Sequence, residues 1–261
     1  MRAPDGTAYD LSGPAGAPPV VLIHGLGLHR GMWAPYINAL AEDHRVLSYD
    51  LYGHGESALP PATPSLTVYS EQLAGVMDAV GMDRGAIVGF SLGGMINRRF
   101  AMDHGARASS LVIIASPHER GDAGQAELEQ RARDSVAGPA ATLDAAIKRW
   151  FTPDFRTANP DYIAQTRTDI LRNDAKVFGE CRWVLAHGVR ELIRPVPAIS
   201  HRTLVMTAEH DSGSTPAMAH AIAEEIAGAK AIVVPHLQHM GLVERPDLFL
   251  PPIHEFLKET K

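Results

Sequence analysis

The chain has 261 residues, of which 45% are hydrophobic and 21% charged, and its formal net charge is −6 at pH 7. This composition predicts a soluble folded protein with a sizeable core, and the acidic balance without a basic block argues against nucleic-acid binding. Cys181 is the single cysteine, so an internal disulfide is excluded. Residues 1–6 lack the apolar stretch of a signal peptide, and no apolar run is long enough to span a bilayer, so we expect a cytoplasmic protein without a membrane partner.

Up to residue 116, short apolar runs alternate with patterns typical of helices. The predicted strands are residues 18–23, 45–49, 86–90 and 109–115. The predicted helices are residues 32–40, 68–80 and 95–102. Continuous apolar runs of this kind suit strands that are buried on both faces. The alternation therefore predicts an α/β protein with a mostly parallel sheet and helices on both faces of it.

Between Pro117 and Pro197 the pattern changes, because this segment contains no convincing strand. Its predicted helices are residues 126–136, 139–151, 160–173 and 175–187. Strands resume at residues 203–207 and 231–234, and further helices are predicted at 216–226 and 247–258. An all-helical block between strands of one sheet is typical of a cap. We therefore expect a helical cap at residues 117–197, inserted into a core formed by residues 1–116 and 198–261.

The segment Gly89-Phe90-Ser91-Leu92-Gly93 has the form Gly-x-Ser-x-Gly and lies between a predicted strand and a predicted helix. This order is the sequence signature of a nucleophile elbow, a sharp turn that exposes a serine hydroxyl. The two glycines allow close approach of neighbouring backbone. Because the serine would also lie at the start of a helix, free N–H groups there favour developing negative charge. Ser91 is therefore the predicted nucleophile.

A serine hydroxyl needs a histidine base, and the base needs a carboxylate that orients it. In elbow-containing hydrolases these residues follow in the order serine, acid, histidine, on loops after sheet strands. Asp211 follows the strand at 203–207, and His239 follows the strand at 231–234. Their nearest rivals are Glu209 for the acid and His236 for the base. Position on each loop favours Asp211 and His239 as the catalytic pair.

Acyl transfer also requires donors for the oxyanion of the tetrahedral intermediate. We expect one to be the backbone N–H of Leu92, directly after the nucleophile, and the other the N–H of Leu26 in the His24-Gly25-Leu26-Gly27 loop. Loss of one such donor typically raises the barrier by about 3 kcal/mol. For His24 itself we expect a structural role, in which its ring holds this loop through hydrogen bonds.

Two further groups of residues have more than one interpretation. Asp50 and His54 lie close together in sequence, but two ligands are too few for a zinc site, so we predict a glycine-rich structural turn and no metal. The aromatic residues of the cap, Trp150, Phe151 and Trp183, either line a substrate pocket or form the core of the cap.

A third group consists of basic residues at helical positions. We expect these side chains on solvated faces, and an anion-binding role for one of them remains open. They are Arg98, Arg99, Lys148, Arg149 and Arg167.

The motifs together resemble the α/β-hydrolase superfamily. The resemblance rests on residues 24–27, 50–57 and 89–94, on Asp211, and on residues 239–246. It implies an α/β-hydrolase fold and a Ser91–His239–Asp211 triad that requires no cofactor. Because the nucleophile is serine rather than aspartate, the chain does not resemble haloalkane dehalogenases or epoxide hydrolases.

Residues 149–155, 178–182 and 89–95 are similar to segments of 3-oxoadipate enol-lactonases, although residues 181–192 depart from that family's pattern. The similarity implies hydrolysis of a small ester or lactone through an acyl-enzyme. The alternatives are a C–C bond hydrolase acting on a vinylogous diketone, a perhydrolase, a plain carboxylesterase, and a non-catalytic ligand-binding homologue. The sequence does not decide among these, nor whether the chain forms a homo-oligomer.

Overall fold

The computed structural model describes residues 1–259, and within them seven strands form one sheet in the order β1-β3-β2-β4-β5-β6-β7. Only β1 is antiparallel to its neighbour, and every other pair of strands is parallel. The predicted mostly parallel sheet is therefore confirmed. The strands are β1 (Tyr9–Ser12), β2 (Pro19–Ile23), β3 (Arg45–Tyr49), β4 (Gly85–Phe90), β5 (Ala108–Ile114), β6 (Thr203–Ala208) and β7 (Lys230–Val234).

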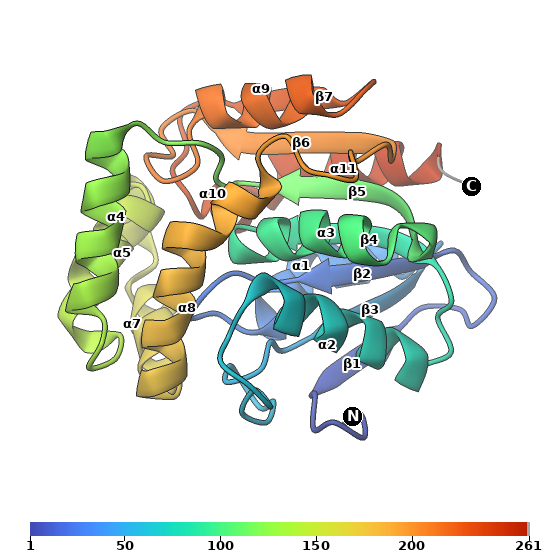
Figure 1. Ribbon diagram of the computed structural model, residues 1–261, viewed down its shortest axis with the longest axis horizontal. Helices are drawn as coiled ribbons and strands as arrows, with labels where there is room; N and C mark the ends of the chain where they lie inside the picture. Colours follow the sequence, from blue (N-terminus) through green and yellow to red (C-terminus); the bar gives the residue numbers. More distant parts are fainter. Residues whose placement is uncertain (260–261) are drawn as a thin grey trace.

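Helices cover both faces of the sheet, as Figure 1 shows. In that view α2 (Leu66–Ala79) and α3 (Leu92–Asp103) lie in front of the strands, and α1 (Ala34–Leu40) and α11 (Pro246–Lys258) lie behind them. Helix α9 (Pro216–Glu225) packs against β6 and β7. Because both faces are covered, all six residues of the central strand β4 are buried. This burial explains the continuous apolar run in its sequence.

A helical insert separates β5 from β6. Its helices gather at one end of the sheet, toward which the arrowheads of β5 and β6 point in Figure 1. In a parallel α/β sheet this end, where the strands finish, is where ligands bind. The helices are α4 (Asp122–Asp134), α5 (Leu143–Trp150), α6 (Pro153–Ala158), α7 (Pro160–Leu171) and α8 (Ala175–His187).

Hydrogen bonds join the insert to loops of the core. The Met240 N–H donates to the Trp150 carbonyl at 2.8 Å, and the Asn173 side-chain amide donates to the Gly27 carbonyl at 3.0 Å. Thr152 donates to Glu244, in α10 (Gly241–Glu244), through its N–H at 2.8 Å and its hydroxyl at 2.6 Å. The insert is thereby held over the loops that follow β2 and β7.

The sequence did not predict β1 and α6, both of which are short. Strand β1 has four residues, none of them buried, and lies at the edge of the sheet, so it lacks the apolar run of the central strands. Helix α6 has six residues and begins at Pro153, after a cap from the Thr152 hydroxyl. Neither element offers enough periodic positions for a pattern to be recognised.

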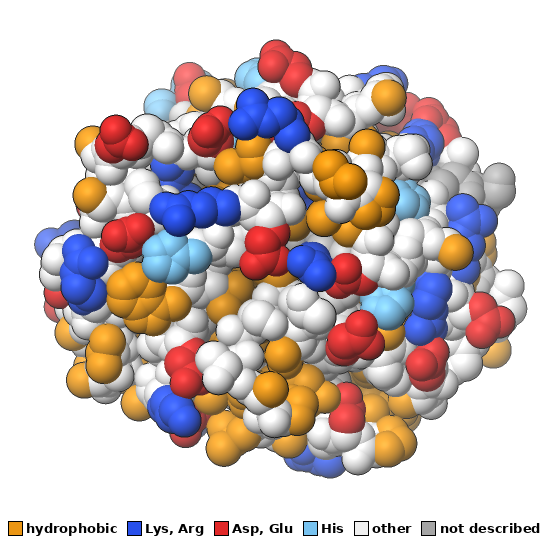
Figure 2. Space-filling view, viewed as in Figure 1, with side chains coloured by type: hydrophobic (Ala, Val, Ile, Leu, Met, Phe, Trp, Pro, Cys, Tyr) orange, Lys and Arg blue, Asp and Glu red, His pale blue; other side chains and the backbone are white. Residues whose placement is uncertain are grey.

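The surface drawn in Figure 2 carries acidic and basic side chains interspersed, without a large patch of either sign. Within residues 1–259, no helix combines the length and the apolar character that crossing a membrane requires.

Candidate active site

Ser91 lies between β4 and α3 in a backbone conformation that non-glycine residues rarely adopt, with φ 54° and ψ −110°. The chain passes very close to itself here. A Cβ added to Gly89 would lie 2.1 Å from the Gly93 carbonyl oxygen, and one added to Gly93 would lie 2.3 Å from the Ile23 carbonyl oxygen. Because only glycine fits at either position, the turn can lift the Ser91 hydroxyl out of the sheet.

The structure brings Ser91, His239 and Asp211 together. The Ser91 Oγ lies 3.1 Å from the His239 Nε2, and the His239 Nδ1 lies 2.6 Å from the Asp211 Oδ2. The second Asp211 oxygen, Oδ1, accepts the N–H groups of Gly213 at 2.8 Å and Ser214 at 2.9 Å. With Nδ1–H donating to Asp211, the His239 Nε2 can accept the Ser91 proton.

The rival acid and base form a separate pair. Glu209 accepts the His236 N–H at 2.8 Å, and its carboxylate lies 3.6 Å from the His236 ring. The His236 side chain is 88% exposed, whereas that of His239 is 12% exposed. His236 and Glu209 therefore contact each other at the surface rather than Ser91.

The two predicted oxyanion donors lie on either side of Ser91. Leu92 is the first residue of α3, where N–H groups have no acceptor within the helix. Leu26 lines the same cavity as Ser91, and its N–H donates to no acceptor among residues 1–259. A Cβ added to the adjacent Gly25 would lie 3.2 Å from the Ser91 Cβ, so this loop passes directly beside the hydroxyl.

His24 holds the Leu26 loop. Its Nδ1–H donates to the Gly25 carbonyl at 2.7 Å, and its Nε2 accepts the Leu51 N–H at 2.9 Å. Burial, and then the neighbouring His54 ring, lower the pKa of His24 well below its usual value. A neutral ring is what this arrangement of one donor and one acceptor requires. The structural role predicted for His24 agrees with these contacts.

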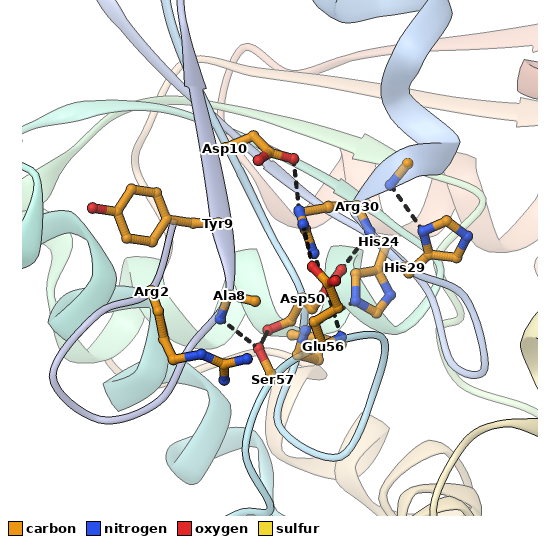
Figure 3. Close-up of polar contacts among 12 residues, drawn as sticks. Arg2, Ala8, Tyr9, Asp10, His24, His29, Arg30, Asp50, Glu56 and Ser57 are labelled. Carbon is orange, nitrogen blue, oxygen red and sulfur yellow. Dashed lines mark hydrogen bonds and ion pairs between the residues drawn. The ribbon is translucent and has the colours of Figure 1, made fainter.

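Charged side chains form a network around Arg30, and Figure 3 shows Arg30 among the carboxylates of Asp10, Asp50 and Glu56. The Asp50 carboxylate is fully buried, pairs with the Arg30 guanidinium, and accepts the backbone N–H groups of Arg30 at 2.7 Å and Glu56 at 2.9 Å. Arg30 also pairs with Asp10 and Glu56, each at 2.6 Å. His54 bonds to the Tyr52 carbonyl at 3.0 Å. Asp50 and His54 thus belong to a structural turn.

Ser91 and His239 line a cavity between the sheet and the insert, whose empty space, counted together with the open solvent at its mouth, is about 640 Å³. Trp150 lies on the insert side, with its ring centre 6.1 Å from that of His239. Trp183 does not line this cavity. Its ring stacks on the ring of His187 instead. Phe151 is fully buried and stacks on a neighbouring aromatic ring of the insert. Of the three predicted aromatics, only Trp150 is kept in the candidate pocket.

The expectation that Arg98 and Arg149 lie on solvated faces is wrong. Arg98 is 1% exposed and donates to the carbonyls of Gly94 and Pro117 and to the Ser116 hydroxyl. Arg149 is partly buried and lines the cavity.

The other basic residues of that group do face solvent. Lys148 is exposed, and Arg99 and Arg167 form ion pairs with Asp103 and Asp144 at the surface. The sequence analysis also missed three cavity-lining arginines, Arg120, Arg131 and Arg182. The sequence of a helix does not show whether a single arginine in it faces a cavity or the solvent.

Known proteins resemble this chain over nearly its whole length. The model of the Alpha/beta hydrolase family matches residues 20–251. The chain is 26% identical to 3-oxoadipate enol-lactonase 1 of Acinetobacter baylyi over 257 residues, which cover 97% of this chain and 94% of that protein.

Two solved structures are similar over nearly the whole chain. The enol-lactonase of Burkholderia xenovorans superposes with a TM-score of 0.87 at 28% identity, covering 97% of this chain and 96% of that one. A thermophilic esterase of Thermogutta terrifontis superposes with a TM-score of 0.86 at 25% identity, covering 97% and 93%. The match to the family model spans far more than half of the sequence, and the chain therefore belongs to the alpha/beta hydrolase family.

Proposed function

We propose that the protein is a serine hydrolase that cleaves a small ester or lactone through an acyl-enzyme on Ser91. The observation that carries this proposal is the hydrogen-bonded series from the Ser91 Oγ through His239 to Asp211. Similarity to two enol-lactonases and to an esterase supports the substrate class.

In the first half of the reaction, the His239 Nε2 takes the Ser91 proton as the Ser91 oxygen bonds to the substrate carbonyl carbon. The N–H groups of Leu26 and Leu92 stabilise the oxyanion. The tetrahedral intermediate then collapses, the bond to the alcohol oxygen breaks, and His239 returns its proton to that oxygen. Asp211 fixes the histidine tautomer and stabilises the imidazolium throughout.

In the second half, His239 removes a proton from water, whose oxygen attacks the acyl carbon and releases the acid and the free Ser91. In a lactone the leaving alcohol stays attached to the acyl group, so one product results. Neither half requires a cofactor. Trp150 and Leu185 give one part of the insert side of the cavity an apolar surface that suits a small ring or acyl chain.

The test is proton release at constant pH with enol-lactones and other lactones, short acyclic esters and a vinylogous diketone, because each hydrolysis liberates an acid. Ser91→Ala should lower turnover at least about a thousandfold. The control is Ser57→Ala, which removes a serine hydroxyl from the Asp50 turn and not from the cavity.

Lactone or ester turnover that survives in Ser91→Ala would overturn the mechanism. Turnover of the diketone alone would replace the proposal by C–C bond hydrolysis. If the wild-type protein hydrolyses none of these compounds, the result would favour a ligand-binding homologue.

A further inference from the structure

Four arginines line the same cavity as Ser91, all from the insert or from the segment that leads into it. They are Arg120, Arg131, Arg149 and Arg182. Arg182 is 6% exposed, and the other three are partly buried. Buried charges in proteins are normally paired, because an unpaired charge taken from water is costly.

Within residues 1–259, only one of these arginines forms an ion pair with a carboxylate. Arg131 pairs with Glu127, one turn earlier on α4. Arg120, Arg149 and Arg182 form neither an ion pair nor a hydrogen bond with any group in residues 1–259, and the buried atoms Arg120 Nη1 and Arg182 Nε have no acceptor there. The Arg182 guanidinium lies over the Phe178 ring, 5.2 Å from its centre, but this ring carries no negative charge. The buried Arg98 differs in degree, because the chain supplies three oxygen acceptors for its Nε and Nη2 atoms and leaves only Nη1 without one within residues 1–259.

The electrostatics of the cavity indicate the same excess of positive charge. Burial, followed by neighbouring arginines, lowers the pKa of Arg120, Arg149 and Arg182 to about 10 each, and at Arg149 the carboxylates of Asp211 and Glu127 offset part of this shift. All three remain protonated at neutral pH. Of the described residues that line the cavity, Asp211 alone carries a carboxylate, and both of its oxygens are already engaged with His239 and with backbone N–H groups.

We infer that Arg120, Arg149 and Arg182 bind a dianionic part of the substrate, either two carboxylates or one phosphoryl group, beside the ester or lactone that Ser91 attacks. Guanidinium groups match both anions, since each can donate two parallel N–H bonds. A single carboxylate would leave two of the three charges uncompensated. This inference rests on the proposed function, and it adds a substrate class to it.

The direct test is calorimetric titration of the wild-type protein with four acids that stand for products. Butyrate supplies only the carboxylate that hydrolysis creates, and glutarate adds one further carboxylate. Tricarballylate adds two, and 3-phosphonopropionate adds one phosphonate. We expect tricarballylate or 3-phosphonopropionate to bind at least about a hundredfold more tightly than butyrate, with glutarate between them. Which of the two binds tighter identifies the kind of anion.

The variants are Arg149→Gln and Arg182→Gln, with Arg182→Lys to keep the charge if the first Arg182 variant folds poorly. Each Gln variant should weaken tricarballylate or phosphonopropionate binding at least about tenfold and reduce its sensitivity to salt. Arg167→Gln is the matched control. It removes an arginine of the same insert that pairs with Asp144 at the surface and lies outside the cavity, so it should leave the affinities unchanged.

A kinetic comparison separates this inference from the proposed function. The 4-nitrophenyl monoester of tricarballylate should be hydrolysed with a higher kcat/KM than 4-nitrophenyl butyrate, and Arg149→Gln should reduce that ratio. Equal kcat/KM values together with equal affinities for all four acids would overturn the inference and leave the hydrolase proposal intact. Tight dianion binding without hydrolysis of any ester or lactone would retain the anion site and overturn the proposed function.

Discussion

On the sheet side of the cavity, the polar side chains bind one another: Ser91 contacts His239, and His239 contacts Asp211. On the insert side, Arg149 and Arg182 line the same space with no ion pair or hydrogen bond to residues 1–259, and the guanidinium of Arg182 lies over the Phe178 ring. The difference separates two roles. The protein itself fixes the reacting groups, so their geometry does not depend on what is bound. We infer that a ligand balances the remaining positive charge on the insert side, and we therefore assign substrate choice to that side.

The largest effect should come from the sheet side. His239→Ala should lower kcat for the preferred substrate by about 10³-fold to 10⁴-fold, because no other group can take the Ser91 proton. His236→Ala is the matched control, since that histidine is exposed and pairs with Glu209. Steady-state kinetics of both variants decides the assignment, and the reverse ranking would identify His236 as the base.

Arg30, which pairs with a buried carboxylate, can be compared with Arg149, which forms no ion pair within residues 1–259. Arg30→Gln leaves the buried Asp50 carboxylate without its guanidinium, so the free energy of unfolding should fall by about 3 kcal/mol. Arg149→Gln breaks no ion pair, and the burial of its charge outweighs its attraction to Asp211 and Glu127, so it should change that free energy by less than about 0.5 kcal/mol, or raise it.

Urea denaturation of the two variants measures both values. Equal destabilisation by Arg30→Gln and Arg149→Gln would mean that the insert arginine has a structural partner, and the contrast between the two sides would fail.

A smaller effect concerns the neutral histidines beneath the Leu26 loop. Burial lowers the pKa of His54 to about 4 and that of His24 well below its usual value. Between about pH 6.5 and pH 4 the unfolded chain binds protons at these rings and the folded chain does not, so stability is full above this window and falls as the pH is lowered through it. At pH 5 the cost for His54 alone is about 2 kcal/mol.

Urea denaturation at pH 7 and pH 5 measures this loss. The variant His54→Gln, which cannot titrate, should lose about 2 kcal/mol less than the wild type over the same interval. An identical loss in the variant would show that folding does not lower the pKa of His54.

The sequence was sufficient to predict the elements around Ser91 because their local pattern determines them. Strand β4 is an uninterrupted apolar run, and the close approaches at Gly89 and Gly93 admit no other residue. Asp211 and His239 could be chosen over Glu209 and His236 because their places after β6 and β7 set their distance from the elbow. The catalytic roles of these residues remain predictions.

The insert side could not be predicted in the same way. Arg182 and Trp183 are neighbours on α8, and only the packing of that helix against α4 and the rest of the fold decides which of them faces the cavity. Local periodicity gives an amphipathic helix but does not say that a charged residue lies on its buried side. Arginine side chains in proteins are mostly exposed, and for this reason the sequence analysis expects Arg149 on a solvated face.

The measurement that tests the central claim most directly is mass spectrometry of the protein quenched within its first turnovers of a 4-nitrophenyl ester. We predict a mass increase equal to the acyl group, located on the peptide that contains Ser91, together with a burst of 4-nitrophenol that matches the enzyme concentration. Turnover of the ester with no acyl group on Ser91 would contradict the account, because the sheet side of the cavity would then not be where the covalent chemistry occurs.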